Sequence, residues 1–353
     1  MHSKEAIQWI NENIEMVDYE IFKKILIDCL GVKKDEEILI LGDVGTKENK
    51  VSAMISAGYY YACNELGIEC KLVLQKPKYK GDKADEDVIE ALYKLRPGSV
   101  IILALSSRIG SIKKVSRSFR NYTMENKHRF ASATNLGQLK EENYHEIINA
   151  IDVDYKQMQE KGEKIKEILD NGKFMHITTE SGTDLRVGIE GCKAIVNAGD
   201  YKLLGKGGNM PAGEVYLPPK WKEINGVVVI DGSSAYRFGT QLIKEPIKVE
   251  IKKGEIASIK GGEEAKKLKE SIDWAYNKAK NPWGVKRVGE IGIGINPNAK
   301  ILGATIIDEK TIGTAHIAFG SNYWFGGTIL AIIHFDQIFK NPKILVDGVE
   351  LKV

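Results

Sequence analysis

Residues 36–75 read EEILILGDVGTKENKVSAMISAGYYYACNELGIECKLVLQ, and this stretch decides the fold of the first half of the chain. Its two ends are short and apolar, which predicts buried strands at 36–43 and 68–75. The segment between them, 47–67, has a helical pattern and ends at a glycine, a common helix stop. Apolar strands joined by a helix are typical of βαβ units, whose parallel sheet is covered by helices on both faces.

The same alternation extends on both sides of this stretch. The N-terminal sequence MHSKEAIQWINENIE predicts an amphipathic helix rather than a signal peptide. Further helices are predicted at 85–95 and 111–121, and further strands at 99–107 and 128–135. The turn GDVGTKENK, 42–50, has the spacing of neither a phosphate loop nor a dinucleotide fingerprint, so we interpret it as an ordinary turn. We therefore predict an α/β domain over residues 1–150, doubly wound and Rossmann- or flavodoxin-like, with a parallel sheet.

From residue 151 the pattern changes to mainly β. Charged amphipathic helices are predicted at 154–172 and 263–280. The other segments alternate apolar and polar residues between Gly and Asp turns, as in 173–191, 225–233, 247–262 and 343–353. A period of two indicates half-buried antiparallel strands. We predict a mainly β (α+β) domain over residues 151–353.

Composition excludes several classes of protein. The chain has 353 residues, 43% of them hydrophobic and 28% charged, with a formal net charge of +3. Lys and Glu are interspersed without a basic, aromatic-rich stripe, so no nucleic-acid partner is expected. No segment approaches ~18 consecutive apolar residues, so we expect no membrane partner and a cytoplasmic protein. The four cysteines form no CxxC pair and are predicted to be buried free thiols: Cys29, Cys63, Cys70 and Cys192.

The chemistry of the chain is concentrated near its C-terminus. In HFD, 334–336, a strand would project His334 and Asp336 from the same face. Imidazole nitrogen and carboxylate oxygen together suit a divalent metal such as Zn, Co, Mn or Fe. His316, in the apolar run TAHIAFG, could join them from the neighbouring strand of a hairpin, with Tyr323 where the chain leaves that strand. A hydrogen-bonded His–Asp pair, a core histidine and a surface tyrosine are the alternatives.

Two glutamates stand in unexpectedly apolar surroundings. Glu214 lies in GEVYLPP and Glu290 in GEIGIGIN. A carboxylate buried there costs several kcal/mol unless it is paired or binds a metal, although either residue could instead be an exposed turn residue. Asp308 and Glu309 are interpreted as a solvated turn or as support for the site. Of the other histidines, His176 has no carboxylate partner nearby in its predicted strand, and none completes a metal site.

In their order along the chain, NMPAGEVYLPP, NGVVVIDGS, GEIGIGINPNAKILG, DEKTIGTAHIAFGSN and IHFD resemble the aminopeptidase T/aminopeptidase S family of metallo-aminopeptidases. The resemblance implies a cytoplasmic, dimeric hydrolase, a metalloprotease that removes N-terminal residues from short peptides. It also implies two divalent metal ions (Zn, Co or Mn) that activate a water molecule. The implied metal ligands are Glu214, Glu290, His316, Tyr323, His334 and Asp336. Glu290 and Tyr323 would also act in catalysis.

Two other functions stay open. Ring-cleaving dioxygenases acting on 2,5-dihydroxypyridine are relatives of the same superfamily, and in them one Fe(II) is held by two histidines and an aspartate. Here His316, His334 and Asp336 would supply that triad. The remaining alternative is a non-catalytic protein whose α/β domain binds a small ligand.

Overall fold

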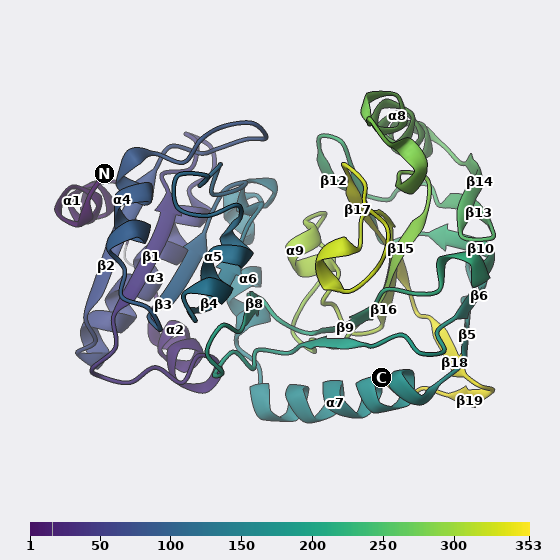
Figure 1. Cartoon of the computed structure of the whole chain (residues 1–353), viewed down its shortest axis with the longest axis horizontal. Helices are drawn as coiled ribbons and strands as arrows, with labels where there is room; N and C mark the ends of the chain where they lie inside the picture. Colours follow the sequence, from purple (N-terminus) through teal and green to yellow (C-terminus); the bar gives the residue numbers. More distant parts are fainter. Residues whose placement is uncertain (16) are drawn as a thin grey trace. The chain divides into compact units, whose positions relative to one another are not determined.

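A computed structural model of the chain describes residues 1–15 and 17–353. The chain forms two compact units (Figure 1). The first contains Met1–Tyr155 and Gly199–Ala212, and the second contains Lys156–Ala198 and Gly213–Val353. The first unit has a parallel sheet with helices and the second has mainly antiparallel sheets, so the predicted fold class is confirmed.

The sheet of the first unit has five parallel strands. In spatial order they are β2 (Cys70–Gln75), β1 (Ile38–Asp43), β3 (Val100–Ala104), β4 (Arg129–Ala133) and β8 (Gly207–Asn209). The order 2-1-3-4 followed by a fifth strand is that of flavodoxin-like sheets. The fifth strand comes from Gly199–Ala212, which lies outside the range 1–150 that we predicted for this domain.

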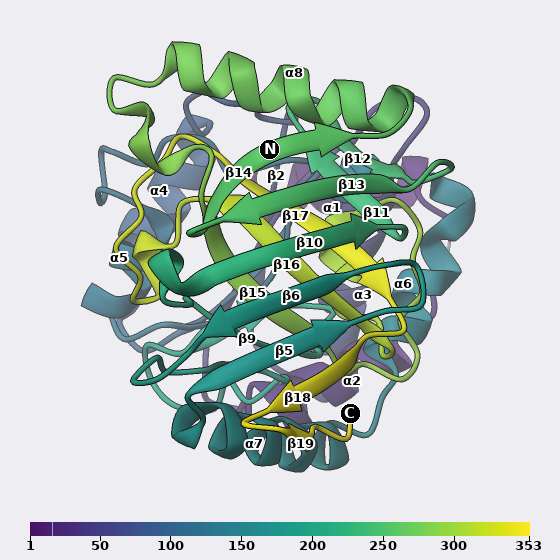
Figure 2. The same cartoon turned by 90° about the vertical axis from the view of Figure 1, so that its right-hand side faces the viewer.

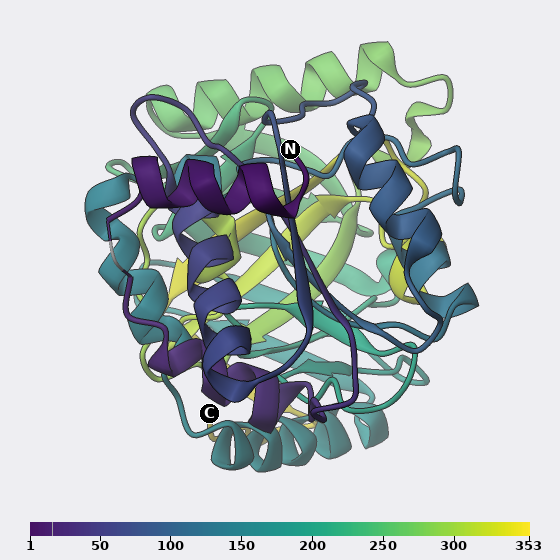
Figure 3. The same cartoon turned by 90° about the vertical axis from the view of Figure 1, so that its left-hand side faces the viewer.

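Helices cover this sheet on both faces, which explains why every residue of β1 is buried. The helices are α1 (Ser3–Asn13), α2 (Glu20–Lys24), α3 (Val51–Leu66), α4 (Glu86–Lys94), α5 (Phe119–Glu125) and α6 (Tyr144–Ile151). Leu39 and Leu41 of β1 pack with Val88 and Leu92 of α4 in one apolar cluster. Helix α3 packs against β1, β2 and β3 (Figure 3), and it ends at Gly67, whose φ of 64° gives the expected glycine stop.

The helix predicted at 111–121 is wrong in position. Helix α5 begins only after Ser118, whose hydroxyl accepts a hydrogen bond from the backbone N–H of Asn121 as an N-cap. Upstream, the N–H of Ser111 donates to the carbonyl of Asp82 at 2.8 Å, and its carbonyl accepts from the N–H of Ala84 at 3.2 Å. Only Ser111 makes these long-range bonds. The next residues form a separate turn, in which the N–H groups of Val115 and Ser116 donate to the carbonyl of Ile112, and the helix does not begin until Phe119.

The second unit is built on two seven-stranded sheets, which lie face to face in Figure 2. One contains, in spatial order, β14 (Glu255–Lys260), β13 (Ile247–Lys252), β10 (Ile224–Ile230), β6 (Asp184–Gly188), β5 (Phe174–Thr178), β18 (Lys343–Val346) and β19 (Val349–Glu350). The other contains β12 (Gly239–Leu242), β11 (Ser233–Tyr236), β17 (His334–Lys340), β16 (Thr314–Gly320), β15 (Val288–Gly294), β9 (Glu214–Leu217) and β7 (Ile195–Asn197). The helices α7 (Tyr155–Asn171), α8 (Glu263–Lys278) and α9 (Thr305–Asp308) complete the secondary structure of this half.

In the part of the chain that the structure describes, no helix has both the length and the apolar character needed to cross a bilayer. The four cysteines are free thiols, as predicted. Cys29 and Cys63 are buried, whereas Cys70 and Cys192 are half-buried.

Candidate metal centre

Four neighbouring strands of one sheet bring together five of the six predicted ligands. Strands β9, β15, β16 and β17 are adjacent in that order, and each pairs antiparallel with the next. The residues they carry are Glu214 on β9, Glu290 on β15, His316 on β16, and His334 and Asp336 on β17. The predicted hairpin-like pairing of the two histidine-bearing strands is therefore confirmed.

A glycine makes room for one of these histidines. Gly292 of β15 lies opposite His316 in the register of the two strands. A Cβ atom at position 292 would lie 2.1 Å from His316 Nε2. Only glycine leaves space for the imidazole there, which gives the Gly/Ile pattern of GEIGIGIN a structural reason.

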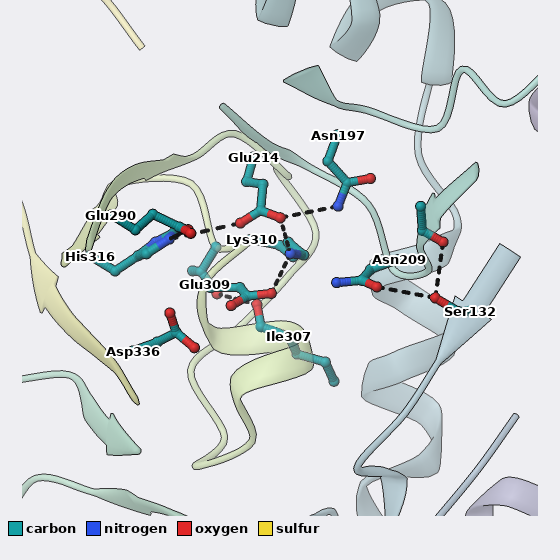
Figure 4. A network of polar contacts seen from close by, with 12 residues as sticks. Ser132, Asn197, Asn209, Glu214, Glu290, Ile307, Glu309, Lys310, His316 and Asp336 are labelled. Atoms are coloured by element: carbon teal, nitrogen blue, oxygen red, sulfur yellow. Dashed lines mark hydrogen bonds and ion pairs between the residues drawn. The ribbon is translucent and has the colours of Figure 1, made fainter. Parts of the chain in front are cut away.

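The donor atoms lie close together around Glu290 (Figure 4). His316 Nε2 is 3.2 Å from Glu290 Oε1, and His334 Nε2 is 3.5 Å from Glu290 Oε2. His334 Nε2 is also 3.2 Å from Asp336 Oδ1, and His316 Nε2 is 3.8 Å from Glu214 Oε2. Glu214, Glu290 and Asp336 are 4%, 5% and 6% exposed, so the exposed-turn alternative is wrong for both glutamates.

Three overlapping groups of residues could each hold a metal ion through atoms within 4.8 Å of one another. They are Glu214–Glu290–His316, Glu290–His334–Asp336 and Glu309–His316–Asp336. None of the groups found among the described residues contains both His316 and His334. The triad His316–His334–Asp336, expected for the dioxygenase alternative, is thus divided: one group contains His334 with Asp336, and another contains His316 with Asp336.

Tyr323, the sixth predicted ligand, is on an exposed connection. It begins the short 3-10 helix η6 (Tyr323–Phe325) in the connection between β16 and β17. Its side chain is 67% exposed, whereas the clustered carboxylates are buried. This position matches the alternative interpretation, a surface tyrosine. The roles of ligand and catalytic residue stay predictions for Tyr323.

Lys310 is a buried residue of the cluster that the sequence did not predict. Lys310 is fully buried, and its ammonium forms ion pairs with Glu214 and Glu309. Asp308 and Glu309 are buried as well, so the solvated-turn interpretation is wrong. Lys310 lies in the segment DEKTIGTAH, directly after Glu309. Its other carboxylate partner, Glu214, lies 96 residues earlier, and no local spacing in the sequence signals that contact.

Backbone and aromatic contacts orient His334. Its Nδ1 lies 2.8 Å from the carbonyl oxygen of Ser321, which places the proton on Nδ1 and leaves Nε2 to face Glu290 and Asp336. The ring of Trp324 packs edge-on against the imidazole, with centroids 4.8 Å apart. A metal-binding histidine commonly has such a partner on its other nitrogen, because that partner fixes the ring and its tautomer.

The charges of the cluster shift one another's pKa values. Burial alone would lower the pKa of His316 and of His334, but the surrounding carboxylates raise them to about 9 and about 10. Burial, together with the charges of Glu214 and Asp336, raises the pKa of Glu309 to about 8 despite Lys310. Burial opposes ionisation of Asp336, yet the neighbouring His334 holds the pKa of that carboxyl below its usual value. These shifts show that the histidines and carboxylates of the cluster are strongly coupled in charge and hold protons in places where a metal ion could replace them.

These residues fit a divalent metal ion. Imidazole and carboxylate donors suit Fe, Mn, Co and Zn. His316 Nδ1 is buried and has no hydrogen-bond partner among residues 1–15 and 17–353. A buried polar atom without a partner is rare, and a bound ion is one explanation. The cluster can therefore hold a metal ion.

The remaining histidines lie away from the cluster. His176 was predicted to have no carboxylate partner, but its Nε2 lies 2.8 Å from Asp184 Oδ1 across the pair of strands β5 and β6. The prediction failed because the partner is on the next strand rather than nearby in the same one. His128, at the start of β4, is fully buried and packs on the ring of Tyr122.

Comparison with known proteins identifies the family. The family model NicX, described as 2,5-dihydroxypyridine 5,6-dioxygenase, matches residues 18–352. The 2,5-dihydroxypyridine 5,6-dioxygenase of Pseudomonas putida KT2440 is 24% identical over 189 residues, which are 51% of this chain and 53% of that protein. The aligned stretch thus spans about half the length of this curated relative.

Two solved structures share the fold. The 2,5-dihydroxypyridine dioxygenase of Pseudomonas putida KT2440 aligns with a TM-score of 0.72 and 17% identity, over 95% of each chain. Wild-type AmpT from Thermus thermophilus aligns with a TM-score of 0.63 and 17% identity, over 94% of this chain and 96% of the other. At such low identity these likenesses show a common fold and nothing more.

The family match corrects the predicted identity. The resemblance to the aminopeptidase T/aminopeptidase S family, and with it the hydrolase, protease and peptide-trimming activity, is wrong because the dioxygenase family accounts for nearly the whole chain. The motifs misled because solved structures with both names have this fold. The chain belongs to the 2,5-dihydroxypyridine 5,6-dioxygenase (NicX) family.

Proposed function

We propose that the protein is a metal-dependent dioxygenase that opens the ring of a dihydroxylated pyridine of the 2,5-dihydroxypyridine type. The observation that carries this proposal is the family match over residues 18–352. The buried cluster of histidines and carboxylates supports it, because mononuclear Fe(II) oxygenases hold their metal with such donors.

We propose one ferrous ion, held by Glu290, His334 and Asp336. The other two groups each include a carboxylate that is paired with Lys310, namely Glu214 or Glu309, whereas this group includes neither. An iron ion held there supplies the one-electron chemistry that dioxygen needs to react with a closed-shell aromatic ring.

The chain's own residues prepare the site for this reaction. Ser321 fixes the tautomer of His334, so that Nε2 is the available donor. Trp324 and Phe325 pack their rings against the imidazole of His334, at centroid distances of 4.8 Å and 6.3 Å. These rings restrict the access of water to the side of the cluster at which His334 is still 21% exposed. His316 contacts the other carboxylate oxygen of Glu290 and lies between Glu290 and Glu214.

The proposal is tested by loading the metal-free protein anaerobically with Fe(II) and adding 2,5-dihydroxypyridine in air-saturated buffer. We expect oxygen uptake on an electrode together with loss of the ring absorbance, and neither change with Zn(II). The substitution Asp336→Asn should lower the rate at least ~100-fold, since it removes a charged ligand. Asp184→Asn is the matched control, because Asp184 forms a similar His–Asp pair at the surface. Absence of oxygen uptake by the Fe(II)-loaded protein would refute this function.

A further inference from the structure

Lys310 is a buried charge that the proposed reaction does not use. Its side chain is 0% exposed, although lysine is almost never fully buried unless it is paired. The ammonium forms ion pairs with Glu214 and with Glu309 at the edge of the cluster, as Figure 4 shows. Its backbone is also fixed, because its N–H donates to the carbonyl of Ile307 and its carbonyl accepts from the N–H of Asn296.

These contacts determine the orientation of Glu214. Lys310 binds Oε1 of Glu214, and the amide nitrogen of Asn197 donates to the same oxygen at 3.1 Å. The second oxygen, Oε2, is left facing His316 Nε2 at 3.8 Å. One glutamate oxygen is therefore engaged by fixed donors while the other points into the cluster.

The balance of charge shows why a fixed cation is needed. Glu214, Glu290, Glu309 and Asp336 are four buried carboxylates whose donor atoms form overlapping groups. Carboxylates placed this close repel one another, and burial weakens the screening by water. Glu290 and Asp336 lie against the imidazoles of His316 and His334, whereas Glu214 and Glu309 share the single ammonium of Lys310.

We propose that Lys310 is a built-in cation of the cluster. It does for Glu214 and Glu309 what a metal ion does for Glu290, His334 and Asp336, and so the cluster is assembled before any metal arrives. Lys310 is thus a positioning residue that acts through Glu214 and Glu309. This inference goes beyond the proposed reaction and does not depend on its substrate.

The test compares the thermal unfolding of Lys310→Met and wild-type protein, each stripped of metal with a chelator and then titrated with Mn²⁺. Methionine keeps the length and apolar stem of lysine but removes the charge. We expect the metal-free variant to melt roughly 5–10 °C below wild type, because Glu214 and Glu309 are left buried without their fixed cation. Mn²⁺ should raise its melting temperature by more than it raises that of wild type, with an apparent affinity about tenfold tighter.

Two further variants separate charge from packing. Lys340→Met removes an exposed lysine at the end of β17 and should behave like wild type. The double variant Lys310→Met/Glu309→Gln removes a carboxylate together with the ammonium, so it should melt above Lys310→Met without metal. A loss of packing alone would not be repaired in this way.

The proposal is overturned if metal-free Lys310→Met melts with wild type, or if Mn²⁺ shifts both proteins equally. If Lys310→Met does not fold, the proposal requires the double variant Lys310→Met/Glu309→Gln to fold. A double variant that does not fold also overturns the proposal. These experiments measure melting temperature and Mn²⁺ binding, not oxygen uptake. A result that overturns the role of Lys310 therefore leaves the proposed dioxygenase activity untouched, and the reverse also holds.

Discussion

His128 and His316 are both fully buried, yet their surroundings move their pKa values in opposite directions. Around His316, three carboxylates outweigh burial and raise the pKa to about 9. Around His128, burial dominates and lowers the pKa, with a carbonyl contact from Nδ1 to Ser99 at 3.2 Å and the ring of Tyr122 beside it. The same residue type is therefore cationic in one place and neutral in the other.

The lowered pKa of His128 predicts a loss of stability in mild acid. In the unfolded chain His128 takes up a proton near its ordinary pKa of about 6.5, whereas the folded protein resists that proton. Because the unfolded state then binds more protons at this site, His128 contributes a decrease in the free energy of unfolding as pH falls below about 6.5, of at most about 1.4 kcal/mol per pH unit. Glu309, His316 and His334, whose pKa values are raised, contribute in the opposite direction, so a variant without His128 is needed to isolate the effect. Urea unfolding at pH 7.5 and pH 5.5 measures this decrease.

The matched variants for this prediction are His128→Asn and His145→Asn. Asparagine at 128 keeps a donor near Ser99 but cannot titrate, so the difference in stability between the two pH values should shrink. His145 has a side chain that is 66% exposed, and its substitution should leave that difference unchanged. Equal pH dependence in wild type and His128→Asn would show that His128 is not the group responsible.

Sequence patterns at the residue scale located donors but not their partners. His334 and Asp336 could be paired from the sequence because residues i and i+2 of a strand share a face. Glu214 and Glu290 were suspected because a carboxylate among apolar residues needs a partner. Lys310 had no such signal: it follows two acidic residues, as a solvated lysine would, and only the folded chain brings it to Glu214.

At the scale of elements, the connection from β16 to β17 determines where His334 lies. Asn322 holds this connection: its Nδ2 donates to the carbonyl of Gly289 at 2.8 Å, and its Oδ1 accepts from the N–H of Ile329 at 2.7 Å. Gly289 immediately precedes Glu290 in β15. One buried amide therefore ties the connection to the strand that carries the central carboxylate.

Replacing this amide should loosen both the connection and the metal site. Asn322→Ala leaves the carbonyl of Gly289 and the N–H of Ile329 without their side-chain partner, which should lower the free energy of unfolding by about 1–3 kcal/mol. Because Ser321 next to it orients His334, the affinity for Mn²⁺ should fall by about tenfold. Urea unfolding and Mn²⁺ titration of the metal-free protein measure the two effects.

Tyr323→Phe is the control on the same connection. The side chain of Tyr323 is 67% exposed, so loss of its hydroxyl should change neither stability nor Mn²⁺ affinity. A lower Mn²⁺ affinity in Tyr323→Phe would instead show that the Tyr323 hydroxyl takes part in metal binding. Unchanged Mn²⁺ affinity in Asn322→Ala would show that the connection does not control the position of His334.

Helices and strands could be predicted from the sequence where the apolar pattern of a segment matches the face that the folded protein buries. Helix α3 and the strands on either side of it follow the pattern of residues 36–75 closely, because their apolar faces are the ones that the sheet buries. The helix predicted at 111–121 was placed too early because Ser111 pairs with Asp82 and Ala84 and the residues after it close a turn on the carbonyl of Ile112, and helical periodicity shows neither feature. The N-cap serine at 118 was the local signal for the true start of the helix.

At the scale of the whole molecule, the chain leaves the second unit once and returns. Residues Gly199–Ala212 supply β8 to the parallel sheet, pairing with β4 from Phe130 to Ser132. This strand has only three residues, two of them glycines, so no strand-like periodicity marks it in the sequence. The sequence predicted a single change of pattern near residue 150 and could not show this excursion.

The cluster lies wholly in the second unit, since Glu214, Glu290, Glu309, Lys310, His316, His334 and Asp336 all belong to Gly213–Val353. Metal binding should therefore stabilise that unit directly, by about 2.7 kcal/mol at a metal concentration 100 times the Kd. Hydrogen exchange followed by mass spectrometry, with and without Mn²⁺, should show slower exchange in β9, β15, β16 and β17. Strands β1–β4 should exchange at unchanged rates, and Asp336→Asn should lose most of the protection. Equal slowing in β1–β4 would mean that the metal acts on the whole molecule rather than on the unit that binds it.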